Sequence, residues 1–414
     1  METLQPKLRF PEFEGDWKLK KISNTIKSID SGWSPQCEDY SADINDWGVL
    51  KTTSVVWEGF NEKENKKLPI KLKPKENIEV LANDILITRA GPTNRVGVSV
   101  HVDKVRPKLM LSDKLIRLRT NENYSSKFIS ILLSLENVKN QIVSKSSGLA
   151  TSQTNISQNI LLNVKLSVPL FEEQTKIANF LSSIDEKINL LKEKKALLEE
   201  YKKGMMQKIF NQEIRFKDDN GSDFEDWKKK ILSEIFDYKK GSGLSKDKLV
   251  ANGINKCILY GELYTKYNEV IFNVLSRTDS NEGLSSKIGD LLIPSSTTTS
   301  GIDLANVTAL NFENILLGGD ITVLRSTQDV NSVFYAYYLS NHKKEEIANY
   351  AQGITIVHLY YSHIKDMIID FPSVAEQTKI ANFLSAIDKK IDLMGTQIKD
   401  MQEYKKGLLQ QMFV

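Results

Sequence analysis

The chain has 414 residues, of which 40% are hydrophobic and 26% charged, an ordinary composition for a globular protein with two or three domains. No apolar run is long enough to cross a bilayer, and the opening METLQPKLRF lacks the apolar segment of a signal peptide. The two cysteines, Cys37 and Cys257, form no C-x-x-C pair, so we expect two reduced thiols in a cytoplasmic protein.

The distribution of charge is uneven along the chain. The formal net charge is only +3, but residues 1–170 hold 25 Lys and Arg against 19 Asp and Glu, giving +6. Residues 215–371 hold 17 against 21, giving −4. A non-specific DNA-binding protein would show a basic stripe in both globular parts. The charge pattern therefore leaves DNA binding open.

In chain order, residues 1–170 predict a mixed α/β domain. Short β-branched or apolar runs at 96–102, 114–119 and 164–169 are separated by Gly, Pro and Asn turns, and a helical pattern covers 128–144. Residues 171–214 predict a long central helix. Residues 215–371 then predict a second mixed domain, with a helical pattern at 334–350, and residues 372–414 a second long helix.

The two halves of the chain repeat each other. PLFEEQTKIANFLSSIDEKI (169–188) returns as PSVAEQTKIANFLSAIDKKI (372–391), and EYKKGMMQKIF (200–210) returns as EYKKGLLQQMF (403–413). The offset is always 203 residues, and 23 of the 42 positions from Pro169 to Phe210 are identical. Weaker echoes link FEGDWKLKKIS (13–23) to FEDWKKKILS (224–233), NDILI (83–87) to GDLLI (289–293), and LIRLR (115–119) to ITVLR (321–325). We expect the shared segments to be scaffold and the divergent blocks to carry specificity.

Both long helices carry heptad-spaced apolar residues, which favours a coiled coil. The predicted seam consists of Ile177, Leu181, Ile184, Ile188, Leu191, Leu198, Ile380, Leu384, Ile387, Ile391, Met394 and Ile398. Lys195 and Lys202 interrupt the first seam. The alternative, in which each helix packs only on its own domain, explains poorly why both copies keep a two-sided seam.

Because a whole domain separates the two helices, the chain can return and lay the second antiparallel to the first. The predicted fold class is α+β, with two mixed domains separated by an antiparallel coiled coil and a pseudo-two-fold internal repeat. In this arrangement we expect Ile184 and Leu191 to face the seam of Ile387, Met394 and Ile398.

A search for catalytic motifs finds none. The chain has no phosphate loop, no G-x-G-x-x-G after a strand and no G-x-S-x-G. KKGSGLSK (239–246) lacks the phosphate-loop spacing, and His358 and His363 are five residues apart, which does not place two ligands on one helix face. Asp185, Glu186 and Lys187 are most simply solvated helix charges. We therefore expect no catalytic residue and no metal site in this chain.

The order of variable and shared blocks resembles the specificity subunit of type I restriction–modification systems. The boxes PLFEEQTKIANFLSSID and PSVAEQTKIANFLSAID carry the resemblance, together with the opener F-E-x-D-W, the NDILI/GDLLI box and YGELYTKY (260–267). The resemblance covers essentially the whole chain. It implies that each variable block is a target-recognition domain that binds one half of a split, asymmetric site in double-stranded DNA.

The same resemblance implies partners and cofactors. The helices would form a spacer and dock two modification subunits, which hold S-adenosylmethionine and methylate an adenine in each half-site. Two restriction subunits, which use ATP and Mg²⁺ to translocate and cleave DNA, would complete the complex. Two other functions remain as alternatives: a coiled-coil adaptor that does not bind DNA, and a fused methyltransferase or nuclease. The missing Asn/Asp-Pro-Pro-aromatic box of adenine methyltransferases speaks against the second.

Two polar loops in each half are the predicted DNA contacts, on chemical grounds alone. Arginine can bind guanine edges or phosphates, and hydroxyl and amide groups can hydrogen-bond to either. The candidates in the first half are Thr88, Arg89, Thr93, Asn94, Arg95, Lys145, Ser146 and Ser147. Those in the second half are Ser295, Ser296, Thr297, Thr298, Thr355 and Tyr360, which include no permanent positive charge.

Overall fold

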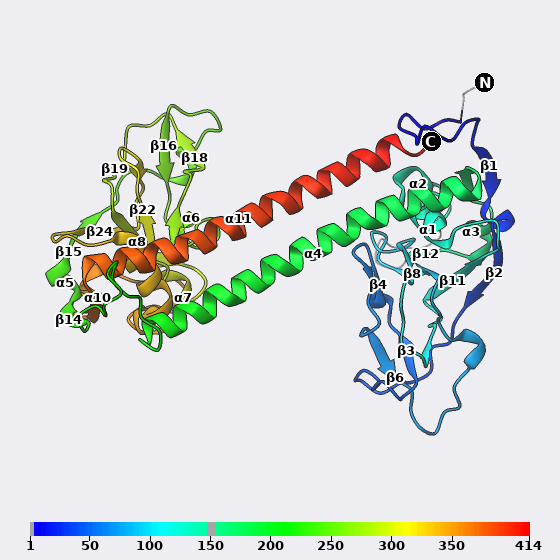
Figure 1. The fold of residues 1–414 in the computed structure, drawn as a ribbon, viewed down its shortest axis with the longest axis horizontal. Coiled ribbons are helices and arrows are strands. Elements are labelled where there is room, and N and C mark those ends of the chain that lie inside the picture. Colours follow the sequence, from blue (N-terminus) through cyan, green and yellow to red (C-terminus); the bar gives the residue numbers. More distant parts are fainter. Residues whose placement is uncertain (1–3, 147–153) are drawn as a thin grey trace. The chain divides into compact units, whose positions relative to one another are not determined.

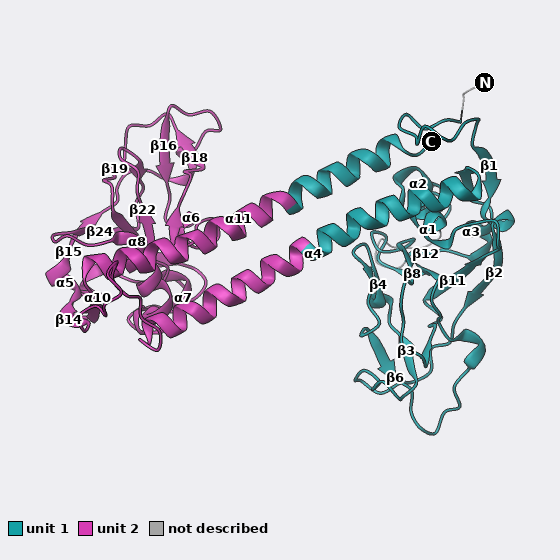
Figure 2. Cartoon of the chain, in the orientation of Figure 1, with its two compact units in different colours: residues 1–190, 398–414 teal, residues 191–397 magenta. Residues whose placement is uncertain are grey.

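The computed structural model describes residues 4–146 and 154–414. The chain divides into two compact units: unit 1 comprises residues 1–190 and 398–414, and unit 2 comprises residues 191–397 (Figure 2). Two long helices, α4 (Phe171–Phe210) and α11 (Val374–Gln411), each contribute one segment to either unit. Within the described ranges, no helix is long and apolar enough to cross a membrane.

Unit 1 is a mixed α/β structure. Its strands are β1 (Lys18–Lys21), β2 (Ile26–Ser31), β3 (Gly48–Leu50), β4 (Val55–Val56), β5 (Gly59–Phe60), β6 (Asn65–Lys67), β7 (Ile85–Thr88), β8 (Ala90–Gly91), β9 (Ser99–His101), β10 (Leu109–Met110), β11 (Leu115–Thr120), β12 (Thr154–Asn155) and β13 (Lys165–Val168), and its shorter helices are α1 (Ser126–Ser134), α2 (Glu136–Val143) and α3 (Gln158–Leu162). A four-stranded antiparallel sheet runs in the order β2-β11-β7-β9, and a second sheet in the order β10-β3-β6. Strands β2 and β11 of the first sheet and β3 and β6 of the second are labelled in Figure 1.

Unit 2 repeats this plan with other residues. Its strands are β14 (Lys228–Ile231), β15 (Phe236–Lys240), β16 (Asn255–Ile258), β17 (Val270–Ile271), β18 (Ser276–Thr278), β19 (Leu284–Ser285), β20 (Asp290–Pro294), β21 (Ser296–Thr297), β22 (Thr308–Leu310), β23 (Leu316–Leu317), β24 (Ile321–Ser326), β25 (Val357–His358) and β26 (Ile368–Phe371), and its α-helices are α5 (Leu232–Ile235), α6 (Glu262–Thr265), α7 (Gly301–Leu304), α8 (Ser332–Tyr337), α9 (Lys344–Asn349) and α10 (Tyr361–Ile364). The order β15-β24-β20-β22 matches β2-β11-β7-β9, with β17 added at the edge. The predicted α+β class and internal repeat are confirmed.

The repeated Glu-Gln of each long helix anchors the start of its unit. In unit 1 the buried Glu173 carboxylate accepts hydrogen bonds at 2.8 Å from Nε and Nη2 of Arg9, and one at 3.3 Å from Nε1 of Trp17. Gln174 accepts a hydrogen bond from the backbone N–H of Ser125, which caps α1, and donates one to the Pro169 carbonyl. A carboxylate in the first turn of a helix is also favoured by the helix dipole.

Unit 2 contains the same arrangement. The fully buried Glu376 accepts hydrogen bonds from the side chains of Arg215, at 3.1 and 2.9 Å, and of Trp227, at 2.9 Å. Gln377 binds the backbone N–H of Asn331, the cap of α8, and the Pro372 carbonyl. The Glu-Gln pair and the tryptophan therefore recur in both halves for the same reason. Each unit holds its N-terminal segment against the long helix that follows its variable block, through a buried, hydrogen-bonded carboxylate.

The last residues of each long helix belong to the core of the other unit. Helix α4 begins in unit 1 and ends in unit 2, and α11 begins in unit 2 and ends in unit 1. Phe413, just after α11, packs against Trp17 and Phe128 in unit 1, with ring centroids 6.0 and 5.7 Å away. Phe210, the last residue of α4, packs in unit 2 against Phe334 and Tyr338, at 6.0 and 5.5 Å. Each domain core therefore needs both copies of the repeat, which explains why EYKKG and the terminal phenylalanine occur twice.

The seam side chains lie at the interior positions of both helices. Every predicted seam residue is buried or half-buried, and in unit 1 Ile177, Leu181, Ile184 and Ile188 share one cluster with Leu408. Within each unit the two helix segments run antiparallel. In unit 1 the side chain of Lys405 lies 2.6 Å from Asp185, and in unit 2 that of Lys202 lies 2.8 Å from Asp388. These are equivalent pairs of the repeat, so the helix pairing is symmetric.

The register corrects one expectation from the sequence. In unit 2 the Lys195 side chain lies against Gly395, and Lys202 pairs with Asp388. Seven residues forward along α4 therefore correspond to seven residues backward along α11, as in an antiparallel pair. Ile184 belongs to the segment paired in unit 1 around Lys405, whereas Ile387 belongs to unit 2 beside Asp388. The prediction that Ile184 faces Ile387 is therefore wrong, because these two residues are symmetry equivalents rather than partners. Asp185 is likewise an ion-pair partner and not only a solvated charge.

Lys202, one of the two lysines that interrupt the first seam, forms ion pairs with two carboxylates. Lys202 Nζ lies 2.9 Å from Glu269 and 2.8 Å from Asp388, and all three side chains are nearly buried. Burial raises the pKa of Asp388 even though Lys202 opposes the shift. Burial would also raise the pKa of Glu269, but the attraction of Lys202 and the hydrogen bonds from Asn341 and Lys202 together outweigh it, and the pKa is lowered. The seam lysine thus fixes a polar junction between the helices and the domain of unit 2.

Glu173→Ala is expected to destabilise unit 1 by about 3 kcal/mol, because it leaves Arg9 and Trp17 without their buried acceptor. The neighbouring Glu172→Ala is the matched control, since Glu172 is exposed in the same helical turn. Hydrogen exchange measures each unit separately. Equal losses of protection in the two variants would contradict the anchor.

Asp185→Lys places two lysines side by side and is expected to weaken the helix pair in unit 1 by about 1 kcal/mol, since both side chains are partly exposed. Combining it with Lys405→Asp restores an attractive pair in the observed antiparallel register. Recovery of the melting temperature in the double variant is the expected result. If the double variant is as unstable as the sum of the two single variants, this register is wrong.

Candidate nucleic-acid interface

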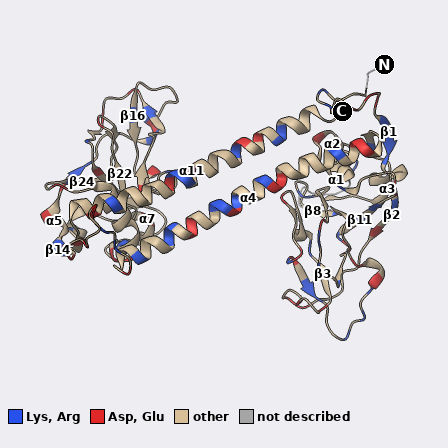
Figure 3. Ribbon diagram, viewed as in Figure 1, with Lys and Arg blue, Asp and Glu red and all other residues tan. Residues whose placement is uncertain are grey.

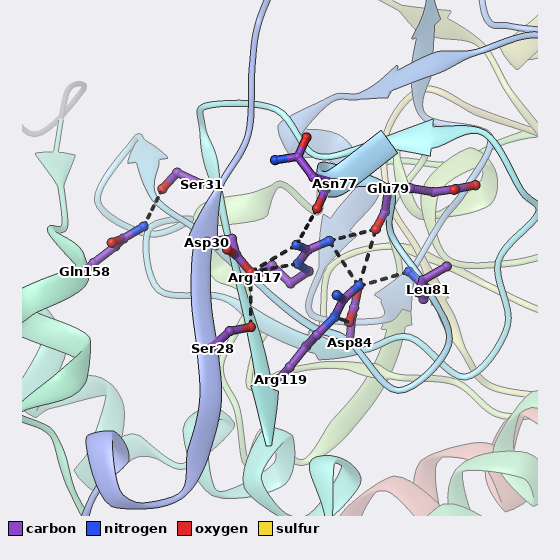
Figure 4. A network of polar contacts seen from close by, with 10 residues as sticks. All are labelled: Ser28, Asp30, Ser31, Asn77, Glu79, Leu81, Asp84, Arg117, Arg119 and Gln158. Carbon is purple, nitrogen blue, oxygen red and sulfur yellow. Dashed lines mark hydrogen bonds and ion pairs between the residues drawn. The ribbon is translucent and has the colours of Figure 1, made fainter. Parts of the chain in front are cut away.

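The repeated box NDILI fixes the start of β7 through a buried aspartate. Asp84 accepts a hydrogen bond from the backbone N–H of Leu81 at 2.9 Å, which closes the turn before the strand. Its carboxylate also binds Arg119 on β11 in bidentate fashion, through Nε at 2.6 Å and Nη2 at 3.2 Å (Figure 4). The ion pair therefore ties the two landmark boxes of the first half, NDILI and LIRLR, to each other.

Unit 2 keeps the same ion pair. Asp290 accepts from the backbone N–H of Lys287 at 2.9 Å and binds Arg325 of β24 at 2.9 and 3.1 Å. Asp84 and Asp290 are both about 1% exposed. The buried aspartate therefore fixes the start of the strand in both boxes.

Arg117 is a buried arginine present only in unit 1. Its guanidinium donates to the carbonyls of Asn77 and Glu79, at 3.1 and 2.7 Å, and to the Asp30 carboxylate at 3.0 Å (Figure 4). The equivalent position on β24 is Val323. Part of the positive charge of residues 1–170 is therefore spent inside the fold and is not available to a nucleic acid.

The first predicted loop, residues 88–95, pairs with a segment that the sequence did not single out, in a short antiparallel ladder. Residues Ala90 and Gly91 of β8 pair with Asn155 and Thr154 of β12, directly after β7 ends. The Ile156 N–H donates to the Arg89 carbonyl at 3.0 Å, and the hydroxyls of Thr93 and Thr154 lie 2.6 Å apart. Segments some 60 residues apart in sequence thus form one surface at the end of a rigid strand.

The ladder places the first-half candidates differently from one another. Thr88 is buried, and its hydroxyl bonds to the carbonyl of Arg95, so the expectation that it lies exposed toward DNA is wrong. Arg89 is partly exposed; its Nε is buried without an acceptor among the described residues, and its Nη1 reaches the Asp113 carbonyl only at 3.5 Å. Arg95 is partly exposed and bonds weakly to the carbonyls of Thr52 and Val55.

Three further first-half candidates lie at or near the surface, and one cannot be placed. Asn94 and Lys145 are exposed, and Ser146 is half-buried with its hydroxyl on the Val143 carbonyl. Ser147 lies outside the described residues. Of the first-half candidates, Arg89 therefore combines a ladder position with the least satisfied charge.

Unit 2 builds an equivalent ladder from β21 and β25. Ser296 pairs with His358 and Thr297 with Val357, and the Leu359 N–H donates to the Ser295 carbonyl at 3.0 Å. The predicted exposed hydroxyl loop is partly wrong, because Ser295, Ser296 and Thr297 are buried. Their hydroxyls bond to the side chains of Thr322, Asp320 and Thr299, respectively, so these hydroxyls are satisfied within unit 2 and are not free at the surface.

The remaining second-half candidates are accessible. Thr298 and Thr355 are exposed, and Tyr360 is 41% exposed. Tyr360 lies between two histidines, with ring centroids 5.5 Å from His358 and 5.4 Å from His363. In the sequence these histidines are candidates only for metal ligands, and no group of three potential metal-ligating side chains occurs among the described residues. Aligning the two halves backward from Pro169 and Pro372 would have placed His358 opposite Asn155.

Arg117→Val, which introduces the residue found at this position in unit 2, is expected to destabilise unit 1 by about 3 kcal/mol because two carbonyls and Asp30 lose their donor. Faster hydrogen exchange of β7 and β11, with unit 2 unchanged, would show this. Val323→Ala is the control and should perturb unit 2 alone. A loss of DNA binding at unchanged stability would mean instead that Arg117 contacts DNA.

Comparison with known proteins identifies the family of this chain. The model of the type I restriction modification DNA specificity domain matches twice, at residues 38–200 and 224–402. The EcoEI specificity subunit of Escherichia coli is 43% identical over 163 residues, which cover 39% of this chain and 27% of that subunit's length. The MjaVIII specificity subunit of Methanocaldococcus jannaschii is 24% identical over 97% of this chain and 92% of its own.

The fold is also that of solved specificity subunits. The S subunit of a type I restriction–modification system from M. genitalium superimposes with a TM-score of 0.63 at 16% identity, over 99% of each chain. A chain from a study of type I complex assembly and conformational transition matches with a TM-score of 0.54 at 14% identity, over 95% of this chain and 96% of its own. With two matched copies that together span most of its length, this chain belongs to the family of type I restriction–modification DNA specificity subunits.

Proposed function

We propose that the two units of this chain each bind one half of a bipartite site in double-stranded DNA. The observation that carries the proposal is the pair of equivalent ladders, β8 with β12 and β21 with β25, each of which follows a strand whose start carries the same buried ion pair. The backbone plan is shared, but the side chains presented on it differ. Two such readers in one chain bind an asymmetric site, because each half-site meets a different chemical surface.

The surfaces of the long helices support docking of the same partner twice. Tyr201 and Tyr404 are equivalent in the repeat and are 50% and 53% exposed, and Asn179 and Asn382 are an identical exposed pair. Packing inside the chain does not require these residues to be the same. We infer that they contact two copies of one modification subunit, since exposed aromatic side chains are typical anchors of protein interfaces.

In this proposal the chemistry belongs to the partners. The modification subunits bind S-adenosylmethionine and methylate an adenine in each half-site, and restriction subunits with ATP and Mg²⁺ complete the nuclease. This chain contributes recognition and assembly and no catalytic residue. A coiled-coil adaptor without DNA binding is less favoured, because it gives no reason for the divergent ladders on a common scaffold.

The decisive experiment exchanges residues 215–371 for the corresponding block of another family member and sequences the methylated adenines in cells that also express the modification subunits. Only one half of the methylated motif is expected to change, because the anchors at Glu376 and Phe210 belong to the shared boxes and are kept. The purified chain alone should not methylate DNA. A change in both half-sites, or methyl transfer by this chain without its partners, would contradict the proposal.

A further inference from the structure

The two ladders can be compared position by position. The backbone hydrogen bonds Ile156 to Arg89 and Leu359 to Ser295 are both 3.0 Å long and connect the same two chain segments in the two units. Arg89 therefore corresponds to Ser295. By the same alignment, Asn155, Ser157 and Ile160 of unit 1 correspond to His358, Tyr360 and His363 of unit 2. Unit 1 thus has a cation where unit 2 has a buried hydroxyl, and unit 2 has three rings where unit 1 has small or aliphatic side chains.

The three rings of unit 2 contact one another in a row, the first two stacked and the third edge-on. His358 and Tyr360 are nearly parallel, with an interplanar angle of 13°, and His363 meets Tyr360 edge-on at 68°. Beside them Tyr361 stacks on Tyr238, at 5.1 Å and 4°. Tyr361 donates its hydroxyl hydrogen to the Phe236 carbonyl, so this neighbouring pair is fixed to β15, while Tyr360 is 41% exposed.

A tight hairpin projects next to the stack. The backbones of Gln352 and His358 bond to each other in both directions, at 2.9 and 2.7 Å. Gly353 has a φ of +126°, and a Cβ there would lie 2.0 Å from the Ile356 carbonyl oxygen, so only glycine fits this turn. Ile354 follows at the tip and is 98% exposed. A rigid turn that presents a fully exposed isoleucine beside an aromatic stack is costly in water and indicates a contact surface.

The ladder of unit 2 offers no permanent positive charge to phosphates, and elsewhere in this unit Lys and Arg are interspersed with Asp and Glu (Figure 3). Of the ladder residues Ser296, Thr297, Val357 and His358, none carries a permanent positive charge, and Asp320 accepts a hydrogen bond from the Ser296 hydroxyl. The exposed Lys365 lies two residues beyond His363, outside the ladder. Residues 215–371 also have an excess of acidic side chains. Apolar and aromatic groups can instead contact thymine methyl groups, partly unstack a base step, or hydrogen-bond to base edges.

We propose that unit 2 binds its half-site through the aromatic surface formed by Ile354, His358, Tyr360 and His363, by shape and stacking rather than by charge. At the equivalent place unit 1 uses the guanidinium of Arg89. The proposal rests on the proposed function, because its ligand is the DNA half-site of unit 2. It assigns to the two halves of one chain two different physical modes of recognition, and these differ in how they respond to salt.

The test measures binding of the complex with its modification subunits to duplex DNA carrying the methylated motif, at several salt concentrations. Tyr360→Ala is expected to weaken binding roughly tenfold to a hundredfold with no change in the salt slope, since no charge is removed. Arg89→Ala is expected to weaken binding and to reduce the salt slope by about one. Tyr360→Phe keeps the ring and should retain most of the affinity.

Phe272→Ala is the matched control, because Phe272 is similarly exposed in unit 2 but follows β17 at the other edge of the sheet. It should leave binding unchanged. Ile354→Ala, at a fully exposed side chain, separates a DNA contact from a folding defect and should also weaken binding. Unchanged affinity in both Tyr360→Ala and Ile354→Ala, or a reduced salt slope in Tyr360→Ala, would overturn the proposal.

A second measurement uses cells. His358→Asn combined with Tyr360→Ser gives unit 2 the side chains of unit 1, and sequencing of methylated adenines should show a relaxed or altered sequence in one half-site only. An unaltered motif would refute the aromatic surface while leaving the proposed function intact. If the unaltered complex itself neither binds nor methylates a specific sequence, the proposed function fails instead.

Discussion

Each core is closed by a phenylalanine at the end of a long helix, and the rest of the structure depends on this constraint. Phe210 completes unit 2 and Phe413 completes unit 1, so neither core is finished by its own variable block. Burial of a phenylalanine in such a cluster contributes about 2–3 kcal/mol. The sequence between Pro169 and Phe210, and its second copy, must therefore remain compatible with two different domains at once.

This constraint determines which parts of the sequence can vary and which cannot. The shared boxes supply Glu173 and Glu376 for the N-terminal anchors and the terminal phenylalanines for the cores. The variable blocks supply an arginine and a tryptophan at the start, an Asp–Arg pair between two strands, and most of the apolar core of each unit. Almost everything else on the ladders can diverge without loss of the fold, as a protein that must recognise different sequences requires.

The two units have the same plan but not the same electrostatics. Unit 1 spends Arg117 and Arg119 inside the domain and keeps Arg89 at the ladder. Unit 2 buries the hydroxyls of its ladder and carries its polar junction at the long helices, where Lys202 binds two carboxylates. The net charge of a block is therefore a poor guide to how it meets DNA, because buried ion pairs remove charges from the surface without changing the total.

The sequence by itself determined the repeat, the fold class and the two-sided seam, because identity at a fixed offset and heptad spacing are visible in the order of residues alone. It also singled out the loops around β8 and β21, although not the strands with which they pair. Only the tertiary structure decided that Thr88, Ser295, Ser296 and Thr297 are buried, because a hydroxyl residue suits an exposed loop and a paired strand equally well. Likewise the helix register depends on Asp185 meeting Lys405, a contact between residues 220 positions apart that no local pattern specifies.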